Sequence, residues 1–178
     1  MTSPEQLVYE ICMTNWYWVR FGAFLTIVFL CFAIPVTAVY SSFQKQQHIR
    51  EQIVLHLRNA NANLNEKDLR AISRTVWEAS KKYGIDYRLV LALMKVESNF
   101  RHDALSEMGA RGLLQVKPSL AKYMASDMGI EWKGNRTIDD PGNNIRIGIH
   151  FLSELVHRFY CVTTALRAYN MGPERTRE

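Results

Sequence analysis

Residues 93–118, LMKVESNFRHDALSEMGARGLLQVKP, contain the features of this chain that decide its fold. Asp86 lies upstream as a good N-cap, and an apolar-rich run follows it. One face of the predicted helix carries residues at the spacing i, i+3, i+4 and i+7, namely Val90, Leu93, Met94 and Glu97. Leu89, Ala92 and Val96 make the other sides apolar as well, so we expect this helix to be buried nearly all round.

Glu97 ends this helix and points where the apolar residues point. Burial destabilises the charged form of a carboxyl group, so the pKa of Glu97 is expected to rise and to make it a proton donor near neutral pH. Spacing alone favours a structural interpretation. In that case Glu97 caps a loop or forms an ion pair with Lys95, Arg101 or Arg111.

Four segments in order resemble the motifs of lytic transglycosylases, the goose-lysozyme-like enzymes that cut bacterial peptidoglycan. They are ESNF at 97–100, GARGLLQVKP at 109–118, DPGNNIRIG at 140–148 and AYNMGP at 168–173. The resemblance covers about residues 69–173. It implies a mostly α-helical, lysozyme-like domain that acts on peptidoglycan glycan strands and needs no cofactor.

The resemblance also implies a chemistry that uses a single glutamate. Glu97 would protonate the leaving sugar and then deprotonate the 6-hydroxyl of the muramic acid, so that a 1,6-anhydro sugar forms without water. Glycosidases more often use two carboxylates. Asp103 and Glu107 are the nearest candidates for a second one, but neither has apolar neighbours that would bury it.

Five further residues match family positions that contact the substrate. By resemblance, Ser98 would bind near the sugar or orient Glu97, and Gln115 would contact the sugar. Tyr169 and Asn170 would line the cleft, and Gly112 would allow a close approach of the backbone. Without the family, the side chains of Ser98, Gln115, Tyr169 and Asn170 would be interpreted as ordinary groups at helix ends.

The remainder of 64–178 reads as a helical catalytic domain. Asn65 is expected to cap a helix that ends at Tyr83 before Gly84. Further helices are predicted from Pro118 to Gly129, from Asp140-Pro141 onward and from Val162 toward Tyr169, with a loop at 132–137. No strand pattern of comparable strength appears.

The N-terminal part has a different character. Residues 1–20 read as a tail, 21–40 as an uncharged transmembrane signal anchor and 41–63 as a stem and linker. Cleavage after Ala38 as a signal peptide is the rival interpretation. Basic residues are more numerous after the span than before it, which opposes export. We nevertheless expect a single-pass protein of the bacterial inner membrane whose domain faces the periplasm, because the substrate lies there.

Composition limits the remaining classes. The net charge of +5 suits an anionic polymer, and neither basic-aromatic repeats nor zinc-finger spacing indicates nucleic acid. Cys12, Cys31 and Cys161 lie before, within and after the predicted span, so no disulfide framework is expected, and Cys161 is predicted to be a buried thiol. The histidines, including His150, show no metal-ligand spacing, so no metal site is expected.

Two departures from the family pattern are visible. Met171 stands where the family usually has a small residue. The family usually continues through another helix that supplies a tyrosine to the site, whereas this chain ends at Glu178. The domain is therefore expected to lack that helix, or to receive the missing wall from a partner.

Three function classes follow from the sequence. The first is a membrane-anchored lytic transglycosylase, the second a goose-type hydrolytic muramidase, and the third a non-catalytic wall-binding or scaffold module. An anchored enzyme of this size would suit a local role beside a cell-envelope machine, although no motif identifies one.

Overall fold

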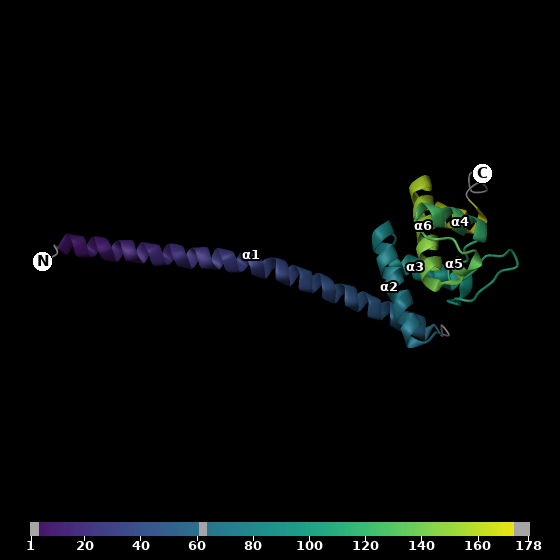
Figure 1. Ribbon diagram of the computed structural model, residues 1–178, viewed down its shortest axis with the longest axis horizontal. Helices are drawn as coiled ribbons and strands as arrows, with labels where there is room; N and C mark the ends of the chain where they lie inside the picture. Colours follow the sequence, from purple (N-terminus) through teal and green to yellow (C-terminus); the bar gives the residue numbers. More distant parts are fainter. Residues whose placement is uncertain (1–3, 61–63, 173–178) are drawn as a thin grey trace. The chain divides into compact units, whose positions relative to one another are not determined.

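The computed structural model describes residues 4–60 and 64–172, and within residues 4–35 most side chains lie outside the described set. The chain divides into two compact units, Met1–His48 and Ile49–Glu178. Figure 1 labels most of the helices. In order they are α1 (Pro4–Asn59), α2 (Glu66–Tyr83), α3 (Tyr87–Ser98), α4 (Pro118–Asp127), α5 (Asn135–Asp139), α6 (Pro141–Phe159) and α7 (Val162–Met171).

The first unit consists of helix. The predicted transmembrane span, residues 21–40, is helical throughout, but most of its side chains lie outside the described residues. Those that are described, among them Phe24, Phe29 and Val39, are exposed. No helix in the described part of the chain is long and apolar enough to cross a membrane. Membrane anchoring therefore stays a prediction.

The second unit begins inside α1. Ile53, Val54 and Leu57 are buried in the hydrophobic core, although the sequence assigned them to a stem and predicted that the domain starts near Leu64. The reason is an apolar stripe at the end of α1 that packs on the domain. Residues 61–63 of the predicted linker lie outside the described residues.

The two helices that follow are bounded as the sequence predicts. The Asn65 side chain accepts a hydrogen bond from the Asp68 amide at 2.9 Å, and Gly84 ends α2 in the left-handed conformation, with φ at 68°. The Asp86 side chain caps α3 by accepting from the Arg88 amide at 2.8 Å. These contacts confirm the predicted caps.

The predicted burial of α3 on all sides is wrong. Val90 and Met94 are buried, but Ala92 and Val96 are exposed, and 78% of Val96 is accessible to solvent. Core elements cover one side of α3 only, because a twelve-residue helix at the edge of a small domain has no second layer to cover its outer side.

Helix α6 is the centre of the second unit and packs against α2, α4, α5 and α7. The Asp140 side chain caps it by accepting from the Asn143 amide at 2.8 Å, and Pro141 occupies its first turn, as predicted. Ile145, Ile149 and Leu152 form part of an apolar stripe on this helix, and all three are buried.

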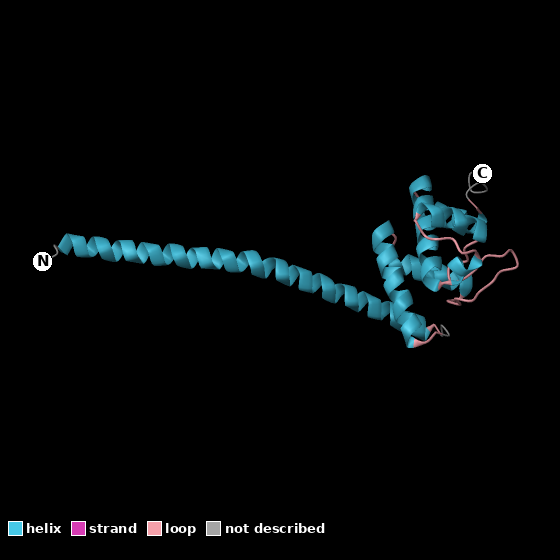
Figure 2. Cartoon of the chain, in the orientation of Figure 1, coloured by secondary structure: helices cyan, strands magenta, loops and turns pink. Residues whose placement is uncertain are grey.

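Helices joined by loops make up the described chain, as Figure 2 shows, so the predicted mostly α class is confirmed. Extended pairing in the described residues is limited to isolated bridges of Arg111 with Leu105 and Val116. The sequence missed α5, because it predicted a loop at 132–137. Cys161 is exposed rather than buried, because it precedes the first turn of α7.

Candidate active site

A cleft of about 610 Å³ opens beside the C-terminal end of α3. Side chains from α3, from the loop between α3 and α4, from the start of α4, and from α6 and α7 line it. Glu97 is the one carboxyl group among the described lining residues. The cleft therefore offers a single candidate for proton transfer by a carboxyl group.

Burial raises the pKa of the Glu97 carboxyl above its usual range, as the sequence predicted. The three basic side chains that could have formed an ion pair with Glu97 contact other residues instead. Arg111 pairs with Asp139 at 2.6 Å, Lys95 donates to the Asn99 side chain at 2.5 Å, and Arg101 lies 3.5 Å from Asp103. A partly buried carboxyl group without these partners is suited to donate a proton.

The backbone reverses directly after Glu97. Asn99 and Phe100 both adopt left-handed conformations, with φ at 52° and 63°. The Asn99 amide caps α3 by donating to the Lys95 and Met94 carbonyls. Phe100 then places its ring in the core, with 1% of the residue exposed. The reversal fixes the end of α3 and with it the position of Glu97.

Ser98 lies behind the cleft. Its hydroxyl donates to the Leu113 carbonyl at 2.9 Å and has a second contact with the Met94 carbonyl at 3.1 Å. The side chain is buried and does not line the cleft. In this arrangement Ser98 connects α3 to residues 112–115, which we call the Gly-Leu-Leu-Gln loop.

Asn144 holds the same loop from α6. It is completely buried, accepts from the Leu114 amide at 2.9 Å, and donates to the carbonyls of Arg111 at 2.8 Å and Ile138 at 3.1 Å. Asn144 lies within the segment at 140–148 that resembles a family motif, but the sequence predicted no role for it. The signal available was a polar residue on the apolar stripe of α6, where a buried amide needs several partners.

Gly112 lies against Asn144 in a left-handed conformation, with φ at 76°. A Cβ atom at this position would lie 2.7 Å from Cγ of Asn144. Gly112 does not line the cleft. Its backbone approaches a protein side chain, whereas the resemblance implied an approach to substrate.

Tyr169 supports the loop from α7. Its hydroxyl donates to the Leu114 carbonyl at 2.8 Å. Burial, and then the nearby charge of Glu97, raise the pKa of the Tyr169 hydroxyl far above its usual range, so it remains protonated and keeps this bond. A Cβ atom at Gly148 would lie 3.0 Å from the same hydroxyl, so a glycine there leaves room for it.

Gln115 occupies the end of the loop with φ at 45°. Its side-chain amide donates to the Gly112 carbonyl at 3.0 Å and to the Ala104 carbonyl at 3.3 Å. These bonds leave the Gln115 side-chain oxygen, which accepts no described hydrogen bond, for contact with a ligand. Asn170 and Met171 are exposed on the wall formed by α7.

The structure thus brings four of the six predicted site residues to the cleft. Glu97, Gln115, Tyr169 and Asn170 line it, whereas Ser98 and Gly112 lie behind it. Neither Asp103 nor Glu107 is among the lining residues, although Ser106 and Met108 from the same loop are.

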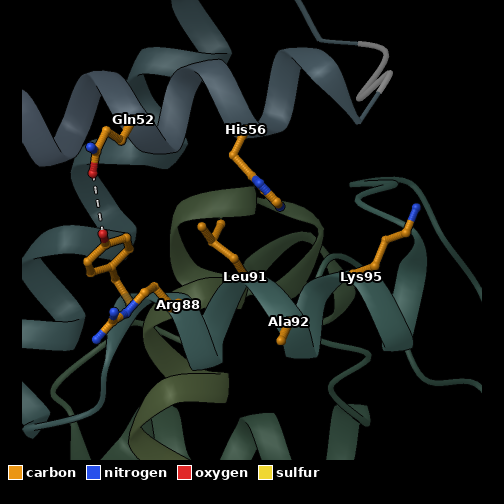
Figure 3. Close-up of a pocket in the computed structure, with 7 residues that line it drawn as sticks. Gln52, His56, Arg88, Leu91, Ala92 and Lys95 are labelled. Carbon is orange, nitrogen blue, oxygen red and sulfur yellow. Dashed lines mark hydrogen bonds between the residues drawn. The ribbon is translucent and has the colours of Figure 1, made fainter.

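A second hollow of about 390 Å³ lies between α3 and the end of α1 (Figure 3). Leu91 projects from α3 toward the helix that carries Gln52 and His56, and the Tyr87 hydroxyl contacts Gln52 at 3.5 Å. Because each helical residue turns by about 100°, Glu97 lies about 200° around α3 from Lys95, which lines this hollow. No carboxyl group is among its described lining residues, so it is not the site of Glu97 chemistry.

The chain is similar in sequence to known proteins. A protein from Klebsiella pneumoniae named membrane-bound lytic murein transglycosylase C is 40% identical over 110 residues, which are 54% of this chain and 30% of that protein. The transglycosylase of Enterobacteria phage PRD1 is 36% identical over 98 residues, or 55% of this chain and 34% of its own. This chain thus spans about a third of the length of these relatives.

Solved structures agree on the fold. The lytic transglycosylase Slt of Pseudomonas aeruginosa, determined as an inactive mutant, has a TM-score of 0.55 at 33% identity, over 58% of this chain and 17% of that one. The 70-kDa soluble lytic transglycosylase, in complex with bulgecin A, has a TM-score of 0.56 at 21% identity. The match covers 72% of this chain and 24% of that one. At 21% identity, the similarity to the 70-kDa enzyme shows a shared fold and nothing more.

The family described as Transglycosylase SLT domain matches residues 74–178. This match extends over more than half of the chain and includes every residue of the cleft. The chain therefore belongs to the transglycosylase SLT domain family.

Proposed function

We propose that this protein is a peptidoglycan lytic transglycosylase that cleaves the β-1,4 bond between N-acetylmuramic acid and N-acetylglucosamine and forms 1,6-anhydro-N-acetylmuramic acid. The observation that carries the proposal is the single carboxyl group, Glu97, whose pKa is raised by burial in a cleft of about 610 Å³. The names of the relatives, which describe murein transglycosylases, support the same substrate class.

The reaction needs one group that gives and then takes a proton. In its neutral form Glu97 donates its proton to the glycosidic oxygen while the bond from that oxygen to C1 of the muramic acid breaks. The resulting carboxylate then takes the proton of the 6-hydroxyl, and O6 forms a bond to C1. Glu97 therefore ends the reaction with the proton that it had at the start. Because the 6-hydroxyl is tethered to the sugar, its effective concentration at C1 is much higher than that of water.

In this proposal the other residues of the site bind the sugar or hold the loop that contacts it. The side-chain oxygen of Gln115 and the exposed amide of Asn170 offer polar contacts to the sugar. Tyr169, Ser98 and Asn144 hold the loop that presents Gln115 through their bonds to Leu113 and Leu114. This support keeps the loop in one geometry as substrate enters.

The absence of a second carboxyl group from the described lining residues favours this reaction over hydrolysis. A retaining hydrolase would place two carboxyl groups about 5–5.5 Å apart, and an inverting one about 6.5–9.5 Å apart. Asp103 and Glu107 are close in sequence to Ser106 and Met108, which line the cleft, but neither carboxyl group is among the lining residues.

Exchange of the carboxyl groups tests this assignment. Glu97→Gln preserves size and removes the proton, so it should lower the cleavage of purified sacculi by about 10²–10⁴-fold. Asp103→Asn and Glu107→Gln serve as matched controls and should retain most activity. If Glu97→Gln keeps more than about a tenth of the activity, Glu97 is not the general acid.

We further propose that residues 21–40 anchor the protein in the bacterial inner membrane and that the domain faces the cell wall. The uncharged run supports this, as does the name of the membrane-bound relatives. Alkaline phosphatase fused after Glu178 should be active if the domain is exported, and an inactive fusion would contradict the orientation.

A further inference from the structure

A group of metal-ligating side chains lies outside the cleft, where α4 ends beside α6. Asp127 is the last residue of α4, and His150 and Glu154 lie one turn apart on α6. Each offers one ligand atom, and the three atoms all lie within 4.8 Å of one another. Nε2 of His150 is 2.8 Å from Oδ2 of Asp127 and 3.8 Å from Oε1 of Glu154.

These separations suit a small cation. Zinc binds imidazole nitrogen and carboxylate oxygen at about 2.0–2.2 Å in a tetrahedral arrangement, which places two ligand atoms about 3.4 Å apart. The two separations from Nε2 of His150 lie on either side of that value. Changes of about half an ångström would bring these two separations to the tetrahedral value. The third separation, between the carboxylate oxygens of Asp127 and Glu154, lies within 4.8 Å, and rotation of these exposed side chains can adjust it.

Charge favours a cation at the same place. Two carboxylates face one imidazole nitrogen, so the group carries an excess of negative charge whether the ring is neutral or protonated. Asp127 adds its charge to the C-terminal end of α4, which already carries a partial negative charge, and the last turn of α4 has no basic residue. A divalent cation would balance both contributions.

The imidazole is also held in place before any ion binds. Its side chain is 15% exposed, and its ring stacks on Tyr83 of α2 with 4.9 Å between centroids. The stack fixes the ring plane. A nitrogen ligand held in this way distinguishes the group from a set of mobile surface carboxylates, and it selects ions that accept imidazole.

We propose that Asp127, His150 and Glu154 form a binding site for a divalent transition-metal ion of the zinc class, with water completing its coordination. The ion connects the end of α4 to the middle of α6. The start of α4 lines the cleft through Ser119 and Leu120, and α6 lines it through Phe151. The ion therefore stabilises one wall of the cleft and takes no part in the chemistry at Glu97.

Titration of Zn²⁺ into the chelator-treated full-length protein tests the site. A Cys161→Ser background removes the thiol that is exposed in the described part of the chain, because that thiol is another possible zinc ligand. Calorimetry should find one ion per chain, and Zn²⁺ should raise the Tm by several degrees, because it binds the folded state. Mg²⁺, which prefers six oxygen ligands, should not reproduce either effect.

Matched variants separate this site from adventitious binding. Glu154→Gln keeps the size of an exposed side chain and should weaken Zn²⁺ binding by about tenfold or more, as should His150→Ala. His157→Ala, on the same helix and exposed, should bind as the background does. Equal binding by the background and Glu154→Gln, or loss of binding in His157→Ala, would overturn the proposal. So would the absence of any Zn²⁺ binding, which would leave the His150–Asp127 contact as a simple ion pair.

Discussion

At the scale of single residues, the chemistry depends on the surroundings of Glu97. The spacing Val90, Leu93, Met94, Glu97 was enough to place this side chain among apolar neighbours, and the raised pKa follows from that placement. The contacts of Lys95 with Asn99 and of Arg101 with Asp103 are local. The sequence could not show that Arg111 would pair with Asp139, because that contact depends on how the loop after α3 approaches α5.

The raised pKa of Glu97 makes a prediction about stability. Its folded-state pKa lies above the usual value of 4.5, so burial favours the protonated form. The stability that this provides is present at low pH and is lost as the pH rises through the folded-state pKa. Glu97→Gln, which stays neutral, should therefore have a higher Tm than the wild type at pH 7.5, and the difference should disappear near pH 3.5.

Thermal unfolding at the two pH values measures this effect. Glu107→Gln provides the control, because Glu107 is exposed, and its Tm should follow the wild type at both pH values. A higher Tm for Glu97→Gln that did not change with pH would mean that burial of charge is not the cause.

At the scale of elements, the Gly-Leu-Leu-Gln loop is held by side chains from three helices. Ser98 of α3, Asn144 of α6 and Tyr169 of α7 bind its backbone at Leu113 and Leu114. Caps such as Asn65, Asp86 and Asp140 were predictable because they act within a few residues. The bonds to the loop were not, because they join residues 15, 30 and 55 positions apart.

Substitution of Gly112 tests whether this loop is tightly packed. Gly112→Ala introduces a Cβ at 2.7 Å from Cγ of Asn144 and also strains a residue with φ at 76°. Gly129 has a similar φ of 66° but nothing within 4 Å of an added Cβ. Gly129→Ala should therefore lower the unfolding free energy by about 1–2 kcal/mol, the strain of holding alanine in a left-handed conformation.

Gly112→Ala should cost more than Gly129→Ala by about 1–3 kcal/mol, because overpacking is added to the same strain. It should also lower activity, since the loop carries Gln115. Chemical denaturation of the two variants measures the difference. Equal losses would show that the contact between Gly112 and Asn144 is not tight.

At the scale of the whole molecule, the domain of Ile49–Glu178 includes the last turns of α1. The sequence assigned residues 41–63 to a stem and linker, because it does not show which surface their apolar side chains cover. Which apolar surface an amphipathic helix covers depends on tertiary packing, and periodicity alone does not contain that information.

Two leucines of α1 test this boundary. Leu57 is completely buried, whereas 52% of Leu55 is exposed. Leu57→Ala should lower the unfolding free energy of the domain by about 2–5 kcal/mol, and Leu55→Ala by much less. The two changes remove the same atoms from one helix, so a similar effect of both would mean that the end of α1 does not pack on the domain in solution.

The central claim, that one glutamate directs the sugar's own hydroxyl, is tested most directly by the products. Purified sacculi digested with the full-length protein should yield muropeptides that end in 1,6-anhydro-N-acetylmuramic acid. These are lighter by one water than the products of a muramidase, and borohydride does not reduce them. Mass spectrometry before and after borohydride therefore decides between the reactions. Reducible N-acetylmuramic acid ends as the main product would contradict the account and establish hydrolysis.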